Sequence, residues 1–359
     1  MPKQNGNRIR SIGYAANSAH SKLKPFSFER RPLGPKDVLI DILYCGICHS
    51  DIHSARSEWR GSMYPVVPGH EIVGKVANTG SSVRKFKAGD IVGVGCMVGS
   101  CGRCASCKAG HEYDCAEGGP TWTYGSEERR IGGHTYGGYS NNIVVDQDFV
   151  LRIPKNVDLA ATAPLMCAGT TTYTPLRYWK AGPGQTVGVL GLGGLGHVAV
   201  KIARSMGAKV IVLTSSKGKV RDALRLGADE ALLTSNRAQM RKYMNSFNLI
   251  IDTVSADHDL NGLLQLLKPD GKMVLVGLPS NPLKIDAFSL VNGHKVLAGS
   301  GLGGIKETQE MLDYCARRMI AADIELIPIQ KVNQAYDRIV KGDVKYRFVI
   351  DMKSLQKSR

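Results

Sequence analysis

Four cysteines stand close together in the stretch SCGRCASCKAGHEYDC, residues 100–115. Their C-x2-C-x2-C-x7-C spacing lets one loop wrap a tetrahedral Zn²⁺ ion with four thiolates and leave no open position. Such a closed site braces a structure and does not activate a substrate. A disulfide or packing role is the alternative, but the nine cysteines follow no recognisable secretion signal and are expected to be reduced. The stretch therefore predicts a structural zinc at Cys101, Cys104, Cys107 and Cys115.

A second set of metal-ligating side chains is scattered along the chain. A catalytic zinc takes fewer protein ligands than a structural one and keeps an open position, so its ligands are often mixed and distant in sequence. The segments CGICHSDIH (45–53), PGHEIVG (68–74) and PLMCAGTTTY (164–173) offer Cys48, His49, His53, His70, Glu71 and Cys167. Spacing alone does not choose among them, and for any one of them a packing role is an equal alternative.

A glycine loop follows the apolar run TVGVL. In GLGGLG, Gly191, Gly193 and Gly196 with the intervening Gly194 and Leu195 match the G-x-G-x-x-G pattern, and a helix with one apolar face comes next. A strand, this loop and a helix are what dinucleotide binding requires, because the turn brings backbone close to a pyrophosphate and points a helix N-terminus at it. The sequence predicts a dinucleotide site here.

The second strand of this unit indicates which dinucleotide binds. An NAD site usually has an acid at the end of that strand, to bind the ribose 2′-hydroxyl. KVIVLTSS instead ends in hydroxyl groups, followed by lysines, at Thr214, Ser215, Ser216, Lys217 and Lys219. Without the carboxylate a 2′-phosphate is not repelled, and hydroxyl and ammonium groups donate to it. We expect NADP(H) rather than NAD(H), the alternative being a solvated Ser/Lys turn.

The 359 residues divide into regions with two different sequence patterns. Short β-like runs separated by glycine and proline fill residues 1–160, and the cysteine lobe spans about residues 96–118. Strands then alternate with helical patterns over 161–302, typical of a doubly wound, Rossmann α/β domain. Residues 303–359 form a tail that we expect to return to the first domain.

Charge and hydropathy limit the function classes. The chain has 47 Lys+Arg against 31 Asp+Glu, a formal charge of +16, but the two signs are interleaved. The interior of the cysteine lobe has few cations and no basic helix follows it, which disfavours the alternative of a zinc-bearing nucleic-acid binder. No apolar run is long enough to cross a membrane. We expect a cytoplasmic protein that binds neither nucleic acid nor membrane.

Taken together, these motifs resemble the zinc-dependent medium-chain dehydrogenases/reductases, in particular the cinnamyl alcohol dehydrogenase group. The resemblance covers about residues 38–352 and also includes GGIKETQEMLDYC and DVKYRFVID. It implies a GroES-like β-rich catalytic domain beside the Rossmann domain, two zinc ions per chain and NADP(H). The implied reaction is hydride transfer between NADP(H) and a primary alcohol or aldehyde, either aromatic, such as cinnamyl, or aliphatic. It also implies a homodimer formed through the outer strand near KVLAGS.

The resemblance assigns roles to single residues. Cys48, His70 and Cys167 would bind the catalytic zinc, with Glu71 as a nearby or exchangeable ligand. Ser50 would pass a proton to the substrate oxygen and His53 would relay it from solvent. Cys45, Cys96 and Cys315 would be structural. The remaining implied positions are His49 at the pyrophosphate, Thr171, Gly277, Gly299, Ser300 and Gly301 on the nicotinamide side, and Trp59, Trp122 and Leu302 in the substrate pocket.

Another member of the same superfamily is the nearest alternative. An NAD-dependent polyol dehydrogenase would keep a catalytic zinc but would more naturally show an acid where Ser215 and Ser216 stand.

Overall fold

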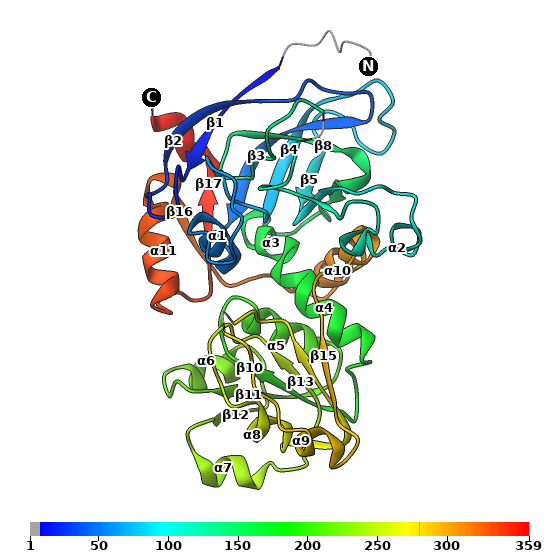
Figure 1. Ribbon diagram of the computed structural model, residues 1–359, viewed down its shortest axis with the longest axis vertical. Coiled ribbons are helices and arrows are strands. Elements are labelled where there is room, and N and C mark those ends of the chain that lie inside the picture. The colour runs from blue at the N-terminus through cyan, green and yellow to red at the C-terminus, as the bar shows by residue number, and fades with distance from the viewer. Residues whose placement is uncertain (1–7, 129, 280, 359) are drawn as a thin grey trace. The chain divides into compact units, whose positions relative to one another are not determined.

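The computed structural model describes residues 8–128, 130–279 and 281–358, which form two compact units (Figure 1). Unit 1 takes the described residues up to Cys167, then Gly304–Ala316 and those from Ala321 onward, and unit 2 takes Ala168–Gly303 and Arg317–Ile320. The tail thus returns to the first unit. The first division lies after Cys167 rather than after residue 160, because the intervening residues form short helices that pack on strands of unit 1.

Unit 1 is built on a seven-stranded sheet of order β16-β17-β3-β4-β5-β9, with β8 paired to β3. Most of its pairs are antiparallel, whereas β16 and β17 from the tail run parallel to each other. The strands are β3 (Asp37–Gly46), β4 (Ile72–Thr79), β5 (Ile91–Val94), β8 (Asn142–Asp146), β9 (Leu151–Arg152), β16 (Ile324–Pro328) and β17 (Arg347–Asp351). The β-like runs in the sequence of this half are therefore confirmed as strands.

Smaller elements complete unit 1. Two further strand pairs are β1 (Ile9–Ala15) with β2 (Lys24–Arg30) and β6 (Met97–Gly99) with β7 (Thr121–Trp122). The helices are α1 (His49–Ala55), α2 (Ala105–Lys108), α3 (Leu159–Thr162), α10 (Ile305–Arg317) and α11 (Val332–Val340), with 3-10 helices η1 (Glu112–Asp114), η2 (Gln147–Phe149), η3 (Ala163–Met166), η4 (Ile329–Lys331) and η5 (Met352–Ser358).

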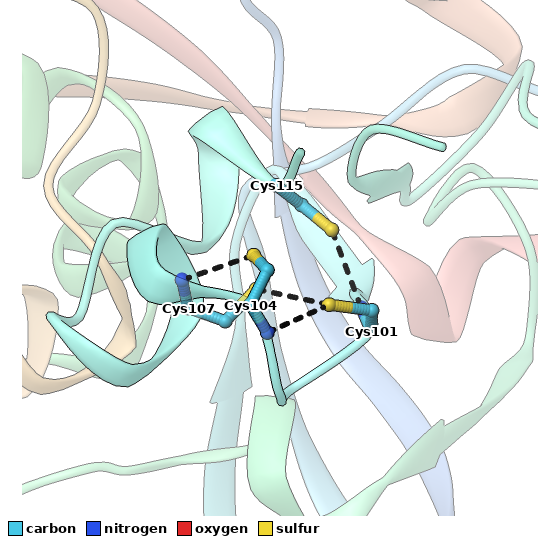
Figure 2. Close-up of side chains that lie close together, drawn as sticks. All are labelled: Cys101, Cys104, Cys107 and Cys115. Carbon is cyan, nitrogen blue, oxygen red and sulfur yellow. Dashed lines mark hydrogen bonds between the residues drawn. The ribbon is translucent and has the colours of Figure 1, made fainter. Parts of the chain in front are cut away.

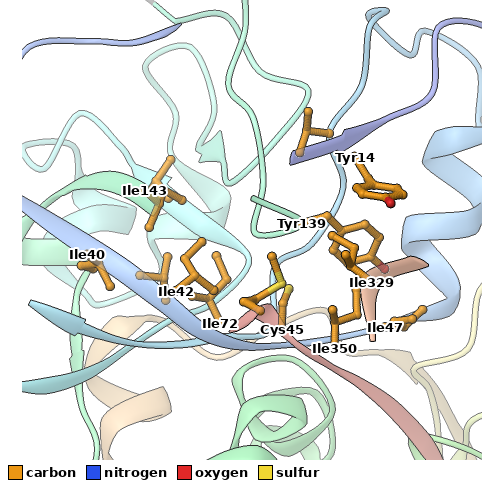
Figure 3. Close-up of a cluster of buried hydrophobic side chains, with 14 of the residues drawn as sticks. Tyr14, Ile40, Ile42, Cys45, Ile47, Ile72, Tyr139, Ile143, Ile329 and Ile350 are labelled. Carbon is orange, nitrogen blue, oxygen red and sulfur yellow. The ribbon is translucent and has the colours of Figure 1, made fainter. Parts of the chain in front are cut away.

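The core of unit 1 joins distant parts of the chain. Figure 3 shows side chains of β3, β4, β8 and β17 gathered around Cys45 and Tyr139, both fully buried. Ile329 and Ile350 of the tail belong to the same core. Burial of these apolar side chains stabilises the sheet, and it fixes the loops at the ends of β3 and β4, from which the candidate site is built.

Unit 2 has a six-stranded parallel sheet of order β12-β11-β10-β13-β14-β15. This is the predicted doubly wound arrangement. The strands are β10 (Thr186–Leu190), β11 (Lys209–Thr214), β12 (Glu230–Leu233), β13 (Phe247–Asp252), β14 (Leu267–Leu275) and β15 (Val296–Gly299). The helices are α4 (Ala168–Tyr178), α5 (Gly196–Ser205), α6 (Lys219–Arg225), α7 (Arg237–Lys242), α8 (Leu260–Leu264) and α9 (Phe288–Val291).

Helix α8 is shorter than the sequence pattern predicts. The run DLNGLLQLLKPDG reads as one helical piece, but the helix ends at Leu264 and β14 begins at Leu267. Leu267 is buried and pairs with Phe247 of β13, so tertiary pairing outweighs the helical spacing of the leucines. Among the described residues, no helix is both long and apolar enough to span a membrane.

Candidate active site and metal centres

One cluster of metal-ligating side chains in unit 1 comes from the residue before α1, the two residues before β4 and the residue after η3. One ligand atom from each of Cys48, His70, Glu71 and Cys167 lies within 4.8 Å of the others, and all four residues are buried. The sulfurs of Cys48 and Cys167 are 3.9 Å apart. Two zinc–sulfur bonds of about 2.3 Å at a tetrahedral angle would separate the sulfurs by about 3.8 Å, so the cluster fits zinc.

The buried carboxylate of Asp51 orients two of these residues. Its Oδ2 accepts from the Cys48 backbone N–H at 2.9 Å, which caps the first turn of α1. Its Oδ1 lies 3.0 Å from His70 Nδ1 and accepts from the Gly69 N–H at 3.1 Å. With Nδ1 occupied in this way, Nε2 of His70 remains as the ligand nitrogen.

Burial and this carboxylate act in opposite directions on His70. Burial favours the neutral imidazole, but the negative charge of Asp51 and its hydrogen bond outweigh it, so the pKa of His70 lies well above the usual value. The same pairing holds the ring in one orientation.

The carboxylate of Glu71 lies in the cluster without a hydrogen-bond partner among the described residues. Its Oε1 is 3.2 Å from Nη2 of Arg347, which is also nearly buried. A side chain at Gly46 would overlap the Glu71 carboxylate, so the glycine makes room for it. The Glu71 carboxylate is buried, accepts no hydrogen bond among the described residues and lies beside two thiols and an imidazole. This combination fits a cation site.

A line of polar side chains runs from the cluster along α1. Ser50 Oγ is 3.4 Å from His70 Nε2. The His53 ring stacks between those of His49 and Trp59, with centroid distances of 4.7 and 4.6 Å, and its Nδ1 pairs with the Glu58 carboxylate. His53 is buried, whereas His49 and Glu58 are exposed, so the line reaches from buried to solvent-facing groups.

The cysteine lobe forms a second cluster, also in unit 1 (Figure 2). Ligand atoms of Cys101, Cys104, Cys107 and Cys115 lie within 4.8 Å of one another, and the sulfurs of Cys101 and Cys107 are 3.8 Å apart. Backbone N–H groups donate to the sulfurs, for example Cys104 N–H to Cys101 Sγ at 3.3 Å. Such bonds favour thiolates, and the one from the Cys107 N–H lowers the pKa of Cys104 to about 6. Four thiolates in this arrangement fit a closed zinc site.

The lobe also contacts the start of α10. The Glu112 carboxylate accepts from the Ile305 backbone N–H at 3.2 Å, which satisfies a donor in the first turn of that helix. A side chain at Gly304 would overlap the Gly110 carbonyl oxygen. The backbones of the lobe and of the returning chain are therefore packed without space for a Cβ.

The glycine loop of unit 2 lies between β10 and α5, as predicted. Gly191 has a φ of +86°, and a Cβ there would lie 2.9 Å from Thr253 Oγ1. A Cβ at Gly196 would overlap the Gly191 carbonyl oxygen, whereas one at Gly193 would have no atom within 4 Å. Gly191 and Gly196 are thus required by packing, and Gly193 leaves backbone open to a ligand, which fits a pyrophosphate. Gly194 and Leu195 complete the turn, and Leu195 precedes the first residue of α5.

Of the other predicted cofactor positions, His49 is the first residue of α1 in unit 1, and the rest lie in unit 2. Strand β11 ends at Thr214, and the hydroxyl and ammonium groups of Ser215, Ser216, Lys217 and Lys219 follow with no acid among them. Thr171 is buried in α4. Gly277 follows β14 and is packed against the Val254 carbonyl, whereas Gly299 and Gly301 flank Ser300 with open space at their Cβ positions. These placements leave the predicted roles as predictions.

The predicted substrate-pocket residues are spread over both units. Trp59 is 44% exposed, and its indole stacks on the ring of His53. Trp122 is 41% exposed on β7, where its backbone pairs with Met97. Leu302 is half-buried in unit 2. Of the three, only Trp59 is placed next to predicted catalytic residues by a contact within one unit.

The sequence did not indicate the contacts that four further residues make in and around this site. Asp51 and Glu58 stand within or just after CHSDIH, and the Asp three residues after Cys48 is a helix-capping signal that could have been used. Arg347 comes from the far end of the chain and carries no local signal. Cys96, expected to be structural, lies beside the cluster. A hydrogen bond with Cys167 lowers the pKa of the Cys96 thiol.

The fold and the two metal clusters define a two-domain zinc dehydrogenase. Residues 34–155 match the family model described as alcohol dehydrogenase GroES-like domain, and residues 194–317 match zinc-binding dehydrogenase. The chain belongs to the zinc-binding dehydrogenases. The predicted resemblance, fold class and enzyme class are confirmed.

Relatives of known name match along the whole chain. It is 52% identical to a probable mannitol dehydrogenase of Fragaria ananassa, over 100% of both chains. It is 51% identical to the aldehyde reductase YahK of Escherichia coli, over 97% of this chain and 99% of the other.

Among solved structures, a cinnamyl alcohol dehydrogenase of Sorghum bicolor matches with a TM-score of 0.93 and 48% identity, over 96% of this chain and 98% of the other. A cinnamyl alcohol dehydrogenase of Helicobacter pylori complexed with NADP(H) matches with a TM-score of 0.92 and 44% identity, over 97% and 99%.

Proposed function

We propose that the protein is a zinc-dependent alcohol dehydrogenase that uses NADP(H) to interconvert primary alcohols and aldehydes. The observation that carries the proposal is the buried cluster of Cys48, His70, Glu71 and Cys167, with a serine hydroxyl beside it and a buried histidine further along α1. The relatives named as an aldehyde reductase and as NADP-dependent alcohol dehydrogenases support it.

The residues around the cluster define its chemistry. Cys48, His70 and Cys167 would hold the zinc, with Glu71 as an exchangeable ligand. When bound, zinc supplies Lewis acidity that polarises the oxygen of an aldehyde, and NADPH supplies the hydride for the carbonyl carbon. Asp51 keeps the Nε2 nitrogen of His70 aimed at the metal position.

The proton needed by the alcohol product would come from the polar line along α1. The Ser50 hydroxyl lies 3.4 Å from His70 Nε2, and we propose that it donates to the substrate oxygen. His53 would return a proton to Ser50, since an imidazole exchanges protons near neutral pH. Glu58 pairs with His53 Nδ1 and would hold the ring while it exchanges with solvent.

The end of β11 supports NADP(H) over NAD(H). No carboxylate stands among residues 214–219 to repel a 2′-phosphate. A comparison of kcat/KM for NADPH and NADH tests this preference, which we expect to favour NADPH by at least about tenfold. Equal values, or a preference for NADH, would contradict it.

For the substrate we propose a chemical class and not a single compound. The indole of Trp59, stacked on His53, suits aryl or long apolar aldehydes. Relatives named mannitol dehydrogenase, at 52% and 54% identity, favour a polyol as the second candidate. A screen with cinnamaldehyde, aliphatic aldehydes and mannitol under both cofactors distinguishes the two classes.

Metal analysis with two variants tests the function itself. The purified protein should contain about two zinc ions per chain and oxidise NADPH when an aldehyde is added. Cys48→Ser should reduce turnover by at least about a thousandfold and leave the lobe zinc in place. Asp41→Asn, at an exposed position of β3, is the matched control and should keep activity. Two zinc ions without aldehyde- or alcohol-dependent turnover would contradict the proposal.

We further propose a homodimer formed through β15. This strand is at one edge of the unit 2 sheet, and nearby Phe288 and Val291 of α9 are 71% and 66% exposed. An open edge beside exposed apolar side chains favours continuation of the sheet into a second copy. Light scattering should give the mass of two chains, and a monomer at micromolar concentration would overturn the proposal. We also propose a cytoplasmic location, because none of the nine cysteines is in a disulfide bond and a reducing compartment keeps zinc-binding thiolates available.

A further inference from the structure

Asp252 and His258 close a short loop at the end of β13. His258 Nε2 lies 2.7 Å from Asp252 Oδ2, and the exposed fractions of the two side chains are 14% and 1%. The other carboxylate oxygen accepts from the Val254 N–H at 3.0 Å, and His258 Nδ1 lies 2.8 Å from the Ala256 carbonyl oxygen. Side-chain contacts therefore connect the start, the middle and the end of residues 252–258.

The partners of His258 determine how many protons the pair holds. A carbonyl oxygen only accepts, so Nδ1 must carry a proton. A further proton must lie between Nε2 and Oδ2, on either atom. Burial raises the pKa of Asp252, which favours keeping that proton in the pair. The pair is a charged imidazolium–carboxylate or its neutral equivalent, and in both forms all contacts are satisfied.

The loop that this pair closes supports two backbone segments. Thr253 Oγ1 donates to the Leu190 carbonyl at 2.8 Å, and it lies where a Cβ of Gly191 would be 2.9 Å away. On its other side, the Val254 carbonyl is packed so closely on Gly277 that a Cβ there would overlap it. The Leu278 N–H donates to Ser255 Oγ at 3.3 Å. Residues 253–255 are thus wedged between the glycine loop and the turn after β14.

We propose that His258, acting through Asp252, is a positioning residue that sets the glycine loop and the turn at Gly277 for binding of the dinucleotide. The inference rests on the proposed function, because it concerns the affinity for NADP(H). His258 does not touch the glycine loop directly in any contact described above, so its effect passes through Thr253 and Val254.

The experiment compares variants in the full-length, zinc-loaded protein. The Kd for NADPH is measured by fluorescence titration without aldehyde, and KM and kcat are measured with it. His258→Ala should raise the Kd and the KM for NADPH at least about tenfold and leave kcat within about twofold. His258→Gln keeps one donor, so its Kd for NADPH should lie between those of the wild type and His258→Ala. His294→Ala, at a 90% exposed side chain of the same unit, is the control and should match the wild type.

Asp252→Asn tests the proton count. The amide keeps an oxygen for the Val254 N–H and offers an N–H to Nε2 of a neutral His258, so the Kd should rise less than it does in His258→Ala. A wild-type Kd in His258→Ala, or a fall in Tm there without any change in Kd, would overturn the positioning role. Failure of the wild-type protein to bind NADPH would instead refute the proposed function.

Discussion

The carboxylate of Asp51 shows what single residues do in this site. It accepts hydrogen bonds from the backbone at Cys48 and Gly69 and from the Tyr139 hydroxyl, and it pairs with His70. Two zinc-ligand candidates are thereby held by one group that does not itself join the metal cluster. Such outer partners raise metal affinity because they fix the ligand before the metal arrives.

Asp51→Asn is therefore expected to weaken the catalytic zinc site. In this variant an NH2 group replaces one of the two carboxylate oxygens. That NH2 group faces N–H or O–H donors that need an oxygen acceptor. The zinc affinity should fall by about 10- to 100-fold, while the lobe zinc is kept. Competition with a chromogenic chelator measures both sites, and equal release profiles in variant and wild type would contradict this role.

The family resemblance singled out residues that the structure brings together in one cluster, whereas local spacing did not choose among the candidates. Cys167 stands 119 residues after Cys48, and only the fold brings their sulfurs together. Arg347 at Glu71 could not be predicted either, because the tail returns to unit 1 through tertiary pairing of β17 with β3.

At the scale of elements, the cysteine lobe supports a helix that follows it by nearly 200 residues. Glu112 lies in the lobe between Cys107 and Cys115, and its carboxylate bonds the first turn of α10. A metal that holds the lobe together therefore also fixes the start of that helix. The sequence predicted a metal site in the lobe but not this contact, because nothing local relates residue 112 to residue 305.

Cys104→Ser should release the lobe zinc and destabilise this region. With three thiolates the closed site is lost, and we expect Tm to fall by roughly 5–10 °C. Hydrogen exchange should become faster at the amides of the first turn of α10. At low temperature the turnover per catalytic zinc should be kept. Unchanged lobe zinc and unchanged Tm would show that the bracing role is wrong.

At the scale of the whole molecule, the interleaved charges contribute to tertiary structure as well as to the surface. Asp37 at the start of β3 is fully buried, with Arg31 at 3.0 Å and Arg130 at 2.7 Å. Burial alone would raise its pKa, but the two guanidinium groups hold the pKa of Asp37 below its usual value. The ion pair of Asp37 with Arg130 thus ties together two segments that lie 93 residues apart in the chain.

Asp37→Asn should destabilise the protein in a pH-dependent way. At pH 7 the loss should be about 3 kcal/mol, since the nearly buried guanidinium of Arg31 keeps only Glu128 of its two carboxylate partners. A lowered pKa in the folded state stabilises above the pKa of the unfolded chain, and this contribution is lost as pH falls through the folded value. The difference from wild type in urea unfolding should therefore shrink below about pH 4.

The exposed pair of Asp343 with Arg338 provides the comparison. Asp343→Asn should cost less than about 1 kcal/mol at any pH. A loss for Asp37→Asn that is no larger than this, or that does not change with pH, would contradict the role of the buried pair.

The contact between Gly110 and Gly304 has a consequence for protein engineering. A Cβ at Gly304 would overlap the Gly110 carbonyl oxygen, whereas Gly110 itself has a φ of +80° and open space at its Cβ position. A lobe transplanted from a relative should therefore need glycine at residue 304 of the recipient chain. The lobe and residue 304 have to be considered together in recombination, although almost 200 residues separate them in the chain.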